Sequence, residues 1–86
     1  MIIYFHKKFT KQIKKLAVAD RDILRKRLEL FIDDPFHVIF RNHALKGKYN
    51  GYRSIDIKPD LRAIYKEINI NEARFVLLGS HGQLYK

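Results

Sequence analysis

The sequence predicts a small α+β domain in which two N-terminal helices pack on one face of a small, twisted antiparallel sheet. Three observations lead to this prediction. The chain has 86 residues, enough for a single domain, here assigned to residues 1–86. Apolar residues follow a helical period in the first half and a strand-like pattern in the second. The connections between the later strand segments are short, which favours antiparallel neighbours.

Two amphipathic helices are predicted between residues 7 and 34. In the first, lysines occupy the positions between the apolar residues and form a basic outer face. Asp20 is a candidate N-cap for the second helix. That helix should end at Asp33-Asp34-Pro35, because proline disfavours helical backbone in the residue before it. The apolar stripes of the two helices are Phe9, Ile13 and Leu16, and Ile23, Leu24, Leu28, Phe31 and Ile32.

Four segments rich in β-branched and aromatic residues predict the strands, at residues 2–5, 52–57, 61–68 and 74–78. Residues 36–49 carry mixed signals, with Gly47 and Asn50-Gly51 as turn formers, and are interpreted as a loop with an extended start. The expected order is therefore β-α-α-β-β-β, followed by a C-terminal turn with one coil of helix. A sheet covered by helices on one face leaves its other face free for a ligand.

The excess of positive charge indicates which kinds of molecule the protein binds. Lys and Arg number 18 against 9 acidic residues, which gives a formal charge of +9. Such an excess predicts binding to a polyanion or to an acidic protein, with nucleic acid as the first candidate. The structural alternative is a solvated, lysine-rich helix face.

The composition also excludes several kinds of site. Without cysteine the chain has neither disulfides nor thiolate metal sites. No apolar run approaches the roughly 20 residues of a membrane span, and the apolar residues at the N-terminus are too few for a signal peptide. We expect a cytoplasmic protein with no role at a membrane, and regard attachment of its basic helices to a membrane surface as the weaker alternative.

His43 and His81 carry the clearest chemical signal. Histidine is the side chain that titrates near neutral pH, so a pair can supply a general base and a general acid together. Both lie beside glycine or small residues in predicted loops. The simpler interpretation is that they are surface loop histidines, which is how we interpret His6 and His37.

Asp56 and Asp60 are candidate partners of these histidines, because a carboxylate can orient an imidazole or take a proton itself. Asp60 follows Pro59, so it also fits ordinary turn chemistry. Asp56 alternates with Ile55 and Ile57, so it equally fits the solvent side of a strand.

The candidate RNA-binding cations are Lys46, Lys48, Arg53 and Arg62. A guanidinium group beside a phosphate stabilises the charge on its oxygens. In a regular strand Arg53 and Asp56 have opposite parity, so either a bulge intervenes or only one of them faces the ligand.

Tyr85 is the tyrosine best suited to stack on a base, since Tyr49, Tyr52 and Tyr65 fit packing within a sheet. No metal site is predicted, because the four histidines lack the close spacing of ligands and cysteine is absent. RNA cleavage requires no metal or other cofactor, because the ribose 2′-hydroxyl is a nucleophile beside its own phosphate.

Short motifs along the second half of the chain resemble those of the RelE/YafQ toxins. They are His43-x-Leu45-x-Gly47, Gly51-Tyr52-Arg53, Pro59-Asp60, Tyr65-Lys66 and Gly79-Ser80-His81, followed by Tyr85. The first half agrees in its β-α-α layout and basic character. The resemblance implies a RelE-like fold and a toxin of a type II toxin-antitoxin system. It implies a ribosome-dependent mRNA endoribonuclease that acts in the ribosomal A site and is inhibited by a cognate antitoxin, expected to be a small acidic protein.

In this resemblance the family's functional positions fall on His43, Asp60, His81 and Tyr85. The family therefore implies that these residues form the catalytic site, with His81 as general acid or base. His43 and the aspartates would be its partners.

Three family positions differ in this chain. Asp56 stands where YafQ-type relatives carry a strand histidine, Leu61 where they carry a tryptophan, and Leu77 where they carry an arginine. Asp56 would then be a candidate base, and Arg53 or Arg62 would serve the phosphate.

Two other functions are compatible with the sequence. A toxin of ParE type shares this scaffold and inhibits DNA gyrase without cutting RNA, and a degenerate toxin would only bind its antitoxin. The presence of His43, Asp60 and His81 favours the nuclease, because a pure inhibitor would not need them.

Overall fold

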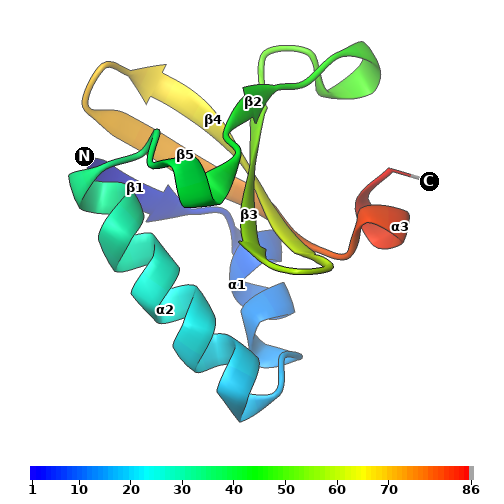
Figure 1. Ribbon diagram of the computed structural model, residues 1–86. Helices are drawn as coiled ribbons and strands as arrows, with labels where there is room; N and C mark the ends of the chain where they lie inside the picture. The colour runs from blue at the N-terminus through cyan, green and yellow to red at the C-terminus, as the bar shows by residue number, and fades with distance from the viewer. Residues whose placement is uncertain (86) are drawn as a thin grey trace.

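The computed structural model of the chain describes residues 1–85, which form one five-stranded sheet with helices. The strands lie in the order β1-β5-β4-β3-β2 (Figure 1). Their bounds are β1 Ile2–Phe5, β2 His43–Ala44, β3 Arg53–Lys58, β4 Leu61–Asn69 and β5 Glu72–Gly79. The helices are α1 Lys7–Lys14, α2 Val18–Asp33 and α3 His81–Leu84, with short 3₁₀ helices η1 Val38–Phe40 and η2 Gly47–Tyr49.

The α+β prediction is confirmed, and the three later strands pair antiparallel as expected. Two features were not predicted. The edge strand β1 runs parallel to β5, with Ile3 opposite Ala73. The two-residue strand β2 lies in the segment predicted as a loop, and it pairs antiparallel with β3 so that His43 stands opposite Ser54.

The two N-terminal helices pack on one face of the sheet, also as predicted (Figure 1). The ring of Phe31, on α2, lies at the centre of this core, with ring centroids 5.0–5.9 Å from those of Phe40, Tyr65 and Phe75. The Asp20 N-cap prediction was wrong, because the helix begins earlier, with Ala17 at its N-cap. Asp20 instead lies in the first turn, where its carboxylate is 2.8 Å from Lys58 Nζ.

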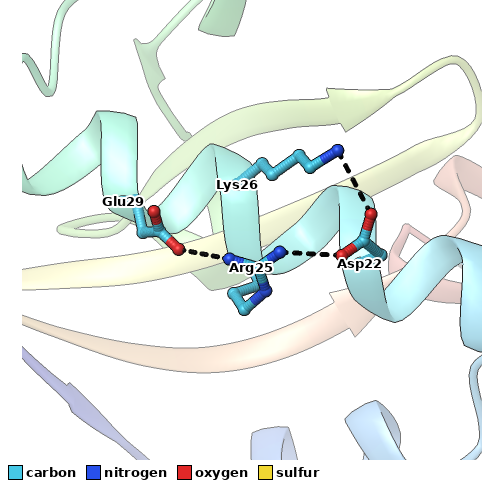
Figure 2. Close-up of polar contacts among 4 residues, drawn as sticks. All are labelled: Asp22, Arg25, Lys26 and Glu29. Carbon is cyan, nitrogen blue, oxygen red and sulfur yellow. Dashed lines mark hydrogen bonds and ion pairs between the residues drawn. The ribbon is translucent and has the colours of Figure 1, made fainter.

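The outer side of α2 carries an exposed ladder of ion pairs (Figure 2). Arg25 reaches Asp22 at 2.8 Å and Glu29 at 2.6 Å, and Lys26 reaches Asp22 at 3.2 Å. These pairs hold the pKa of Asp22 below its ordinary value. Fully exposed pairs at this spacing add little to helix stability, so their main effect is to neutralise charge on α2.

The opposite face of the sheet is left uncovered by α2, and α1 borders it beside β5, where Lys8 lines a cavity with Val76 and Leu77. Register partners lie on the same face, so Ser54, Ile64 and Leu77 form one row across it. Asp56, Arg62 and Gly79 form the next row. A bulge at Val76 shifts the register of β5, so that Phe75 and Leu78 both reach the core while Leu77 does not. Within residues 1–85, no helix has the length and apolarity needed to cross a membrane.

Candidate functional site

The free face of the sheet places His43 beside the strand that carries Asp56. Because His43 is the register partner of Ser54, its ring lies on this face. Nδ1 of His43 is 2.9 Å from the carbonyl oxygen of Arg41. A carbonyl only accepts hydrogen bonds, so in the neutral ring Nδ1 carries the proton and Nε2 keeps its lone pair. The contact therefore leaves Nε2 as the nitrogen available to take a proton from a ligand.

Asp56 lies between two arginines on the same face. Arg41 Nε donates to Asp56 Oδ2 at 2.7 Å, and Arg62 Nε lies 3.5 Å from Oδ1. The carboxylate is only 18% exposed, whereas the Arg41 side chain is 73% exposed. These three residues and His43 line one open cavity of about 220 Å³. Four side chains from the η1–β2 segment, β3 and β4 thus meet at one point.

A second cluster lies at the C-terminus and contains His81 and Tyr85. The ring centroids of His81 and Tyr85 are 4.8 Å apart, and Tyr85 in turn lies 5.9 Å from Tyr49. Tyr49 Oη donates to the carbonyl oxygen of Leu84 at 2.9 Å. The Tyr85 hydroxyl is buried and has no hydrogen-bond partner among residues 1–85. The aromatic rings therefore hold α3 against η2 and leave His81 exposed.

The helix that carries His81 is short and depends on its first turn. Ser80 is the N-cap, and its hydroxyl accepts a hydrogen bond from Gln83 N at 3.2 Å. The Gln83 side chain accepts one from Ser80 N at 2.8 Å, which completes a capping box. The two clusters are linked through the sheet, because Gly79, directly before Ser80, is the register partner of Arg62.

Comparison with known proteins decides the family. A family model described as the bacterial toxin of type II toxin-antitoxin systems, YafQ, matches residues 1–86. The chain belongs to the YafQ toxin family. It is 28% identical to the mRNA interferase toxin YafQ of Escherichia coli K12, over 96% of this chain and 94% of the relative.

Solved YafQ structures agree with this membership. The crystal structure of YafQ from E. coli strain BL21(DE3) superposes with a TM-score of 0.83 at 26% identity, over 98% of this chain and 97% of that one. YafQ in the E. coli DinJ-YafQ complex gives a TM-score of 0.74 at 25% identity, with the same coverage. The RelE-like fold expected from the short motifs is therefore confirmed.

In this YafQ-family toxin, Arg53 lies away from the other predicted site residues. Its side chain points to the same side of β3 as those of Ile55 and Ile57, which lie in the core. No register shift occurs between Arg53 and Asp56 that would change this direction. Of the two possibilities raised by the strand pattern, only Asp56 faces the free side of the sheet. The Arg53 guanidinium instead lies over the ring of Phe36, 5.2 Å from its centroid.

The polar contacts of Arg53 are structural. Its Nε donates to Asn42 Oδ1 at 2.8 Å, and Asn42 Nδ2 donates to the hydroxyl of Tyr65 and the carbonyl of Pro35. Burial raises the pKa of Tyr65 above its ordinary value. This network fixes the segment that leads to Arg41 and His43, so Arg53 supports the site from behind.

The other predicted residues lie around the two clusters. Asp60 is exposed at the β3–β4 turn, where its φ of 62° is left-handed, a conformation that aspartate tolerates better than most residues. Lys46 and Lys48 are exposed next to and within η2, and Lys48 Nζ lies 5.2 Å from the centroid of the Tyr49 ring. Lys48 therefore borders the C-terminal cluster, to which Tyr49 belongs.

The two leucines at positions where the resemblance leads one to expect a tryptophan and an arginine lie in different surroundings. Leu61 is buried in the core. Leu77 is half-buried on the free face and is the register partner of Ile64. Neither leucine supplies a polar group to the site.

Sequence reasoning missed Arg41, Asn42 and Tyr49. The sequence favours Tyr49 as a packing residue, and no motif marks Arg41 or Asn42. The one feature that could have pointed to Arg41 is its position two residues before the candidate histidine His43. Among residues 1–85, no group of three or more His, Cys, Asp or Glu side chains is arranged to hold a metal ion.

Proposed function

We propose that this YafQ-family toxin is an mRNA interferase that cuts RNA through the ribose 2′-hydroxyl. The observation that supports this most directly is the cavity where His43, Arg41, Asp56 and Arg62 meet on the face that α2 leaves uncovered. It combines a proton acceptor with guanidinium groups, which are the components needed beside a phosphodiester. The similarity to the mRNA interferase YafQ of E. coli K12 supports the same activity.

The reaction moves two protons. A general base takes the proton of the 2′-hydroxyl, and O2′ attacks the adjacent phosphorus. The bond from phosphorus to O5′ breaks, and a general acid protonates the leaving O5′. The products are a 2′,3′-cyclic phosphate and a 5′-hydroxyl end. Because the nucleophile is held beside its phosphate, the chemistry proceeds without a metal ion or other cofactor.

The position of each proton-carrying group supports the role proposed for it. His81 is exposed at the start of α3 and acts as general acid or base. His43 presents Nε2 on the free face and is its partner. Asp60 is exposed at the turn and assists proton transfer. Tyr85 packs on the His81 ring and holds it, with part of its own ring available to a base.

The expected partners match the charge of the chain. The mRNA is bound in the ribosomal A site, where Lys46, Lys48 and Arg62 contact the phosphates of RNA. The formal charge of +9 favours this association. In the cytoplasm the toxin is inhibited by a small acidic antitoxin, and the solved DinJ-YafQ complex of E. coli supports a partner of this kind.

The direct test adds purified toxin to ribosomes programmed with a defined message and maps both RNA ends. Cleavage in phase with the codon, leaving a 2′,3′-cyclic phosphate, is expected for the wild type. His81→Ala and His43→Ala should each reduce the rate by about 10²–10⁴-fold, the usual contribution of a proton-transfer group. Equal cleavage by wild type and His81→Ala, or no cleavage by either, would overturn the proposal.

A non-cutting toxin is the second candidate, and two observations favour it. The Asp56 carboxylate is already engaged by two arginines. Leu77 leaves an apolar side chain where YafQ-type relatives carry a cation. Induced expression separates the candidates: loss of protein synthesis indicates the nuclease, DNA damage indicates an inhibitor of gyrase, and normal growth with intact antitoxin binding indicates a degenerate toxin.

A further inference from the structure

We propose that Arg41 and Arg62, held side by side by the Asp56 carboxylate, form a phosphate-binding clamp opposite His43. In this proposal Asp56 is a positioning residue that carries no proton in the reaction. The inference deepens the proposed nuclease function, because it assigns the scissile or adjacent phosphate of RNA to one place on the sheet. It adds Arg41, which no sequence motif marked.

The way the two guanidinium groups are held leaves their best donors free. Each arginine approaches Asp56 through Nε, at 2.7 Å for Arg41 and 3.5 Å for Arg62. Within residues 1–85, neither arginine has another ion pair or side-chain hydrogen bond, so the terminal Nη groups stay available. Two guanidinium groups sharing one carboxylate keep one net positive charge at the cavity. Paired N–H donors of this geometry match the oxygens of a phosphate.

Arg41 also ties the clamp to the histidine through its backbone. Its φ of 43° and ψ of 46° are left-handed, a conformation that is uncommon for a residue with a side chain. In this conformation its carbonyl oxygen accepts from His43 Nδ1 at 2.9 Å while its side chain reaches Asp56. Local strain of this kind persists where the surroundings fix it. One residue thus sets both the imidazole orientation and one arm of the clamp.

The surroundings of Asp56 suit positioning better than proton transfer. Both carboxylate oxygens face a guanidinium group, and the side chain is 18% exposed. A general base needs a lone pair directed at the substrate hydroxyl. Here each carboxylate oxygen has a guanidinium Nε within 3.5 Å, whereas His43 lines the same cavity and its Nε2 has no hydrogen-bond partner among residues 1–85. The proton acceptor of this cavity is therefore His43, and Asp56 acts through the arginines.

The phosphate site is tested first without RNA. Inorganic phosphate is titrated into ¹⁵N-labelled toxin while the Nε–H signals of the arginines are followed by NMR. We expect the Arg41 and Arg62 signals to shift together and those of Arg21, an exposed arginine on α2, to stay in place. Asp56→Asn should weaken the apparent affinity about 10-fold or more, in line with removal of a charge-assisted hydrogen bond. Unchanged Arg41 and Arg62 signals would overturn the clamp.

Cleavage kinetics then separate positioning from proton transfer. Asp56→Asn should lower kcat/KM about 10- to 100-fold while both limbs of the pH profile remain. Loss of one limb would instead make Asp56 a proton carrier and refute the positioning role. Arg21→Gln, which removes the same charge from the far side of the molecule, should leave kcat/KM within about 2-fold, as expected of a distant surface site.

A second measurement compares the effect of Asp56→Asn on kcat/KM in the wild type with its effect in a variant that lacks both arginine side chains. Arg41→Gly keeps the left-handed backbone accessible and removes the side chain, so the protein should fold normally. In the Arg41→Gly, Arg62→Gln background, Asp56→Asn should cause no further decrease in kcat/KM, because its only role is to hold those arginines. An undiminished decrease in this background would refute the proposal. If no variant cleaves RNA at all, the nuclease proposal fails, and the phosphate titration still decides the clamp.

Discussion

Gly79 is the residue at which the sheet passes into the helix that carries His81. A Cβ at this position would lie 2.8 Å from Gln83 Oε1 and 3.3 Å from Gln83 Cβ. The first distance is shorter than real Cβ contacts allow, so the Gln83 side chain would have to move. That side chain forms half of the capping box with Ser80. A larger residue here would therefore disturb the capping box by close approach. Backbone conformation does not require glycine at this position, because the φ angle of Gly79 is not left-handed.

Gly79→Ala should loosen α3 without unfolding the sheet. Breaking the hydrogen bond from Ser80 N to Gln83 Oε1 should destabilise the helix by about 1 kcal/mol, the usual value of an N-terminal cap. Faster amide exchange in residues 81–85 and slower RNA cleavage are the expected results. They are measured by NMR hydrogen exchange and by the programmed-ribosome assay.

Gly82→Ala is the matched control within the same helix. A Cβ at Gly82 would meet no atom within 4 Å, and alanine favours helix over glycine by roughly 0.5–1 kcal/mol. This variant should protect α3 from exchange and keep cleavage intact. If both alanine variants behaved alike, close packing at Gly79 would not be what holds His81 in place.

The sequence was a better guide to which side chains could carry chemistry than to which of them lie together in the fold. His43, Asp56 and Arg62 were all selected, and they do meet around one cavity. The parity argument left two possibilities for Arg53 and Asp56, and the regular register between them leaves only Asp56 on the free face. Arg41 was missed because its role depends on a left-handed backbone and on a hydrogen bond to Asp56, 15 residues away. Neither leaves a periodic signal.

The edge strand β1 is fastened to the sheet by a polar contact as well as by its backbone pairing. Tyr4 Oη donates to Glu72 Oε2, and Asn69 Nδ2 donates to the other carboxylate oxygen. These hydrogen bonds, from Tyr4 first and then Asn69, lower the pKa of the Glu72 carboxyl. The same contact raises the pKa of Tyr4, because ionising the phenol would remove the donor and add repulsion from Glu72.

The shift at Glu72 predicts how this strand responds to acid. A carboxyl whose pKa is lower in the folded state stabilises the fold above its ordinary value of 4.5 and loses that effect as pH falls through the folded value. The difference in unfolding free energy between wild type and Glu72→Gln should therefore be largest near neutral pH and shrink below about pH 4.5. Denaturant unfolding across this pH range measures it.

Asp33→Asn serves as the comparison, because Asp33 is an exposed carboxylate at the end of α2 with no ion pair among residues 1–85. This variant removes the same charge without breaking an ion pair, so it controls for the effect of net charge on stability. A Glu72→Gln difference that stays constant down to strongly acidic pH would contradict the linkage between this carboxyl and the folded state.

Elements with strong periodicity were predicted well, and elements made by long-range pairing were not. The apolar stripes located α1 and α2, and alternation with short turns located β3, β4 and β5. The parallel pairing of β1 with β5 joins residues about 70 positions apart, which a local pattern cannot encode. Strand β2 has only two residues, too few for any period. The start of α2 was misplaced because Asp20 pairs with Lys58 and caps nothing.

Across the whole molecule, positive charge is distributed unevenly. The helix α1 has no acidic residue in its first turn, and its lysines have no ion pair among residues 1–85. On α2 the cations Arg25 and Lys26 are paired with Asp22 and Glu29 (Figure 2). The formal charge of +9 is therefore presented from α1 and from the free face more than from α2. Lys8 of α1 lines a cavity with Tyr52 and Leu77 of the free face, so a polyanion surface should approach where α1 borders that face.

This distribution predicts which cations set the salt dependence of ribosome binding. Lys11→Gln with Lys14→Gln removes two unpaired charges from α1, and Arg21→Gln with Lys26→Gln removes two from α2. Removing one cation that neutralises a phosphate lowers the slope of log affinity against log salt by about 0.7–0.9. We expect the α1 pair to reduce that slope by up to about 1.8, twice the value for one cation, and the α2 pair to leave it nearly unchanged. Both pairs are built into the His81→Ala background, and co-sedimentation with programmed ribosomes is measured over a range of salt concentrations. Since both pairs change the net charge equally, equal slopes would mean that total charge alone governs association and that α1 makes no contact with RNA.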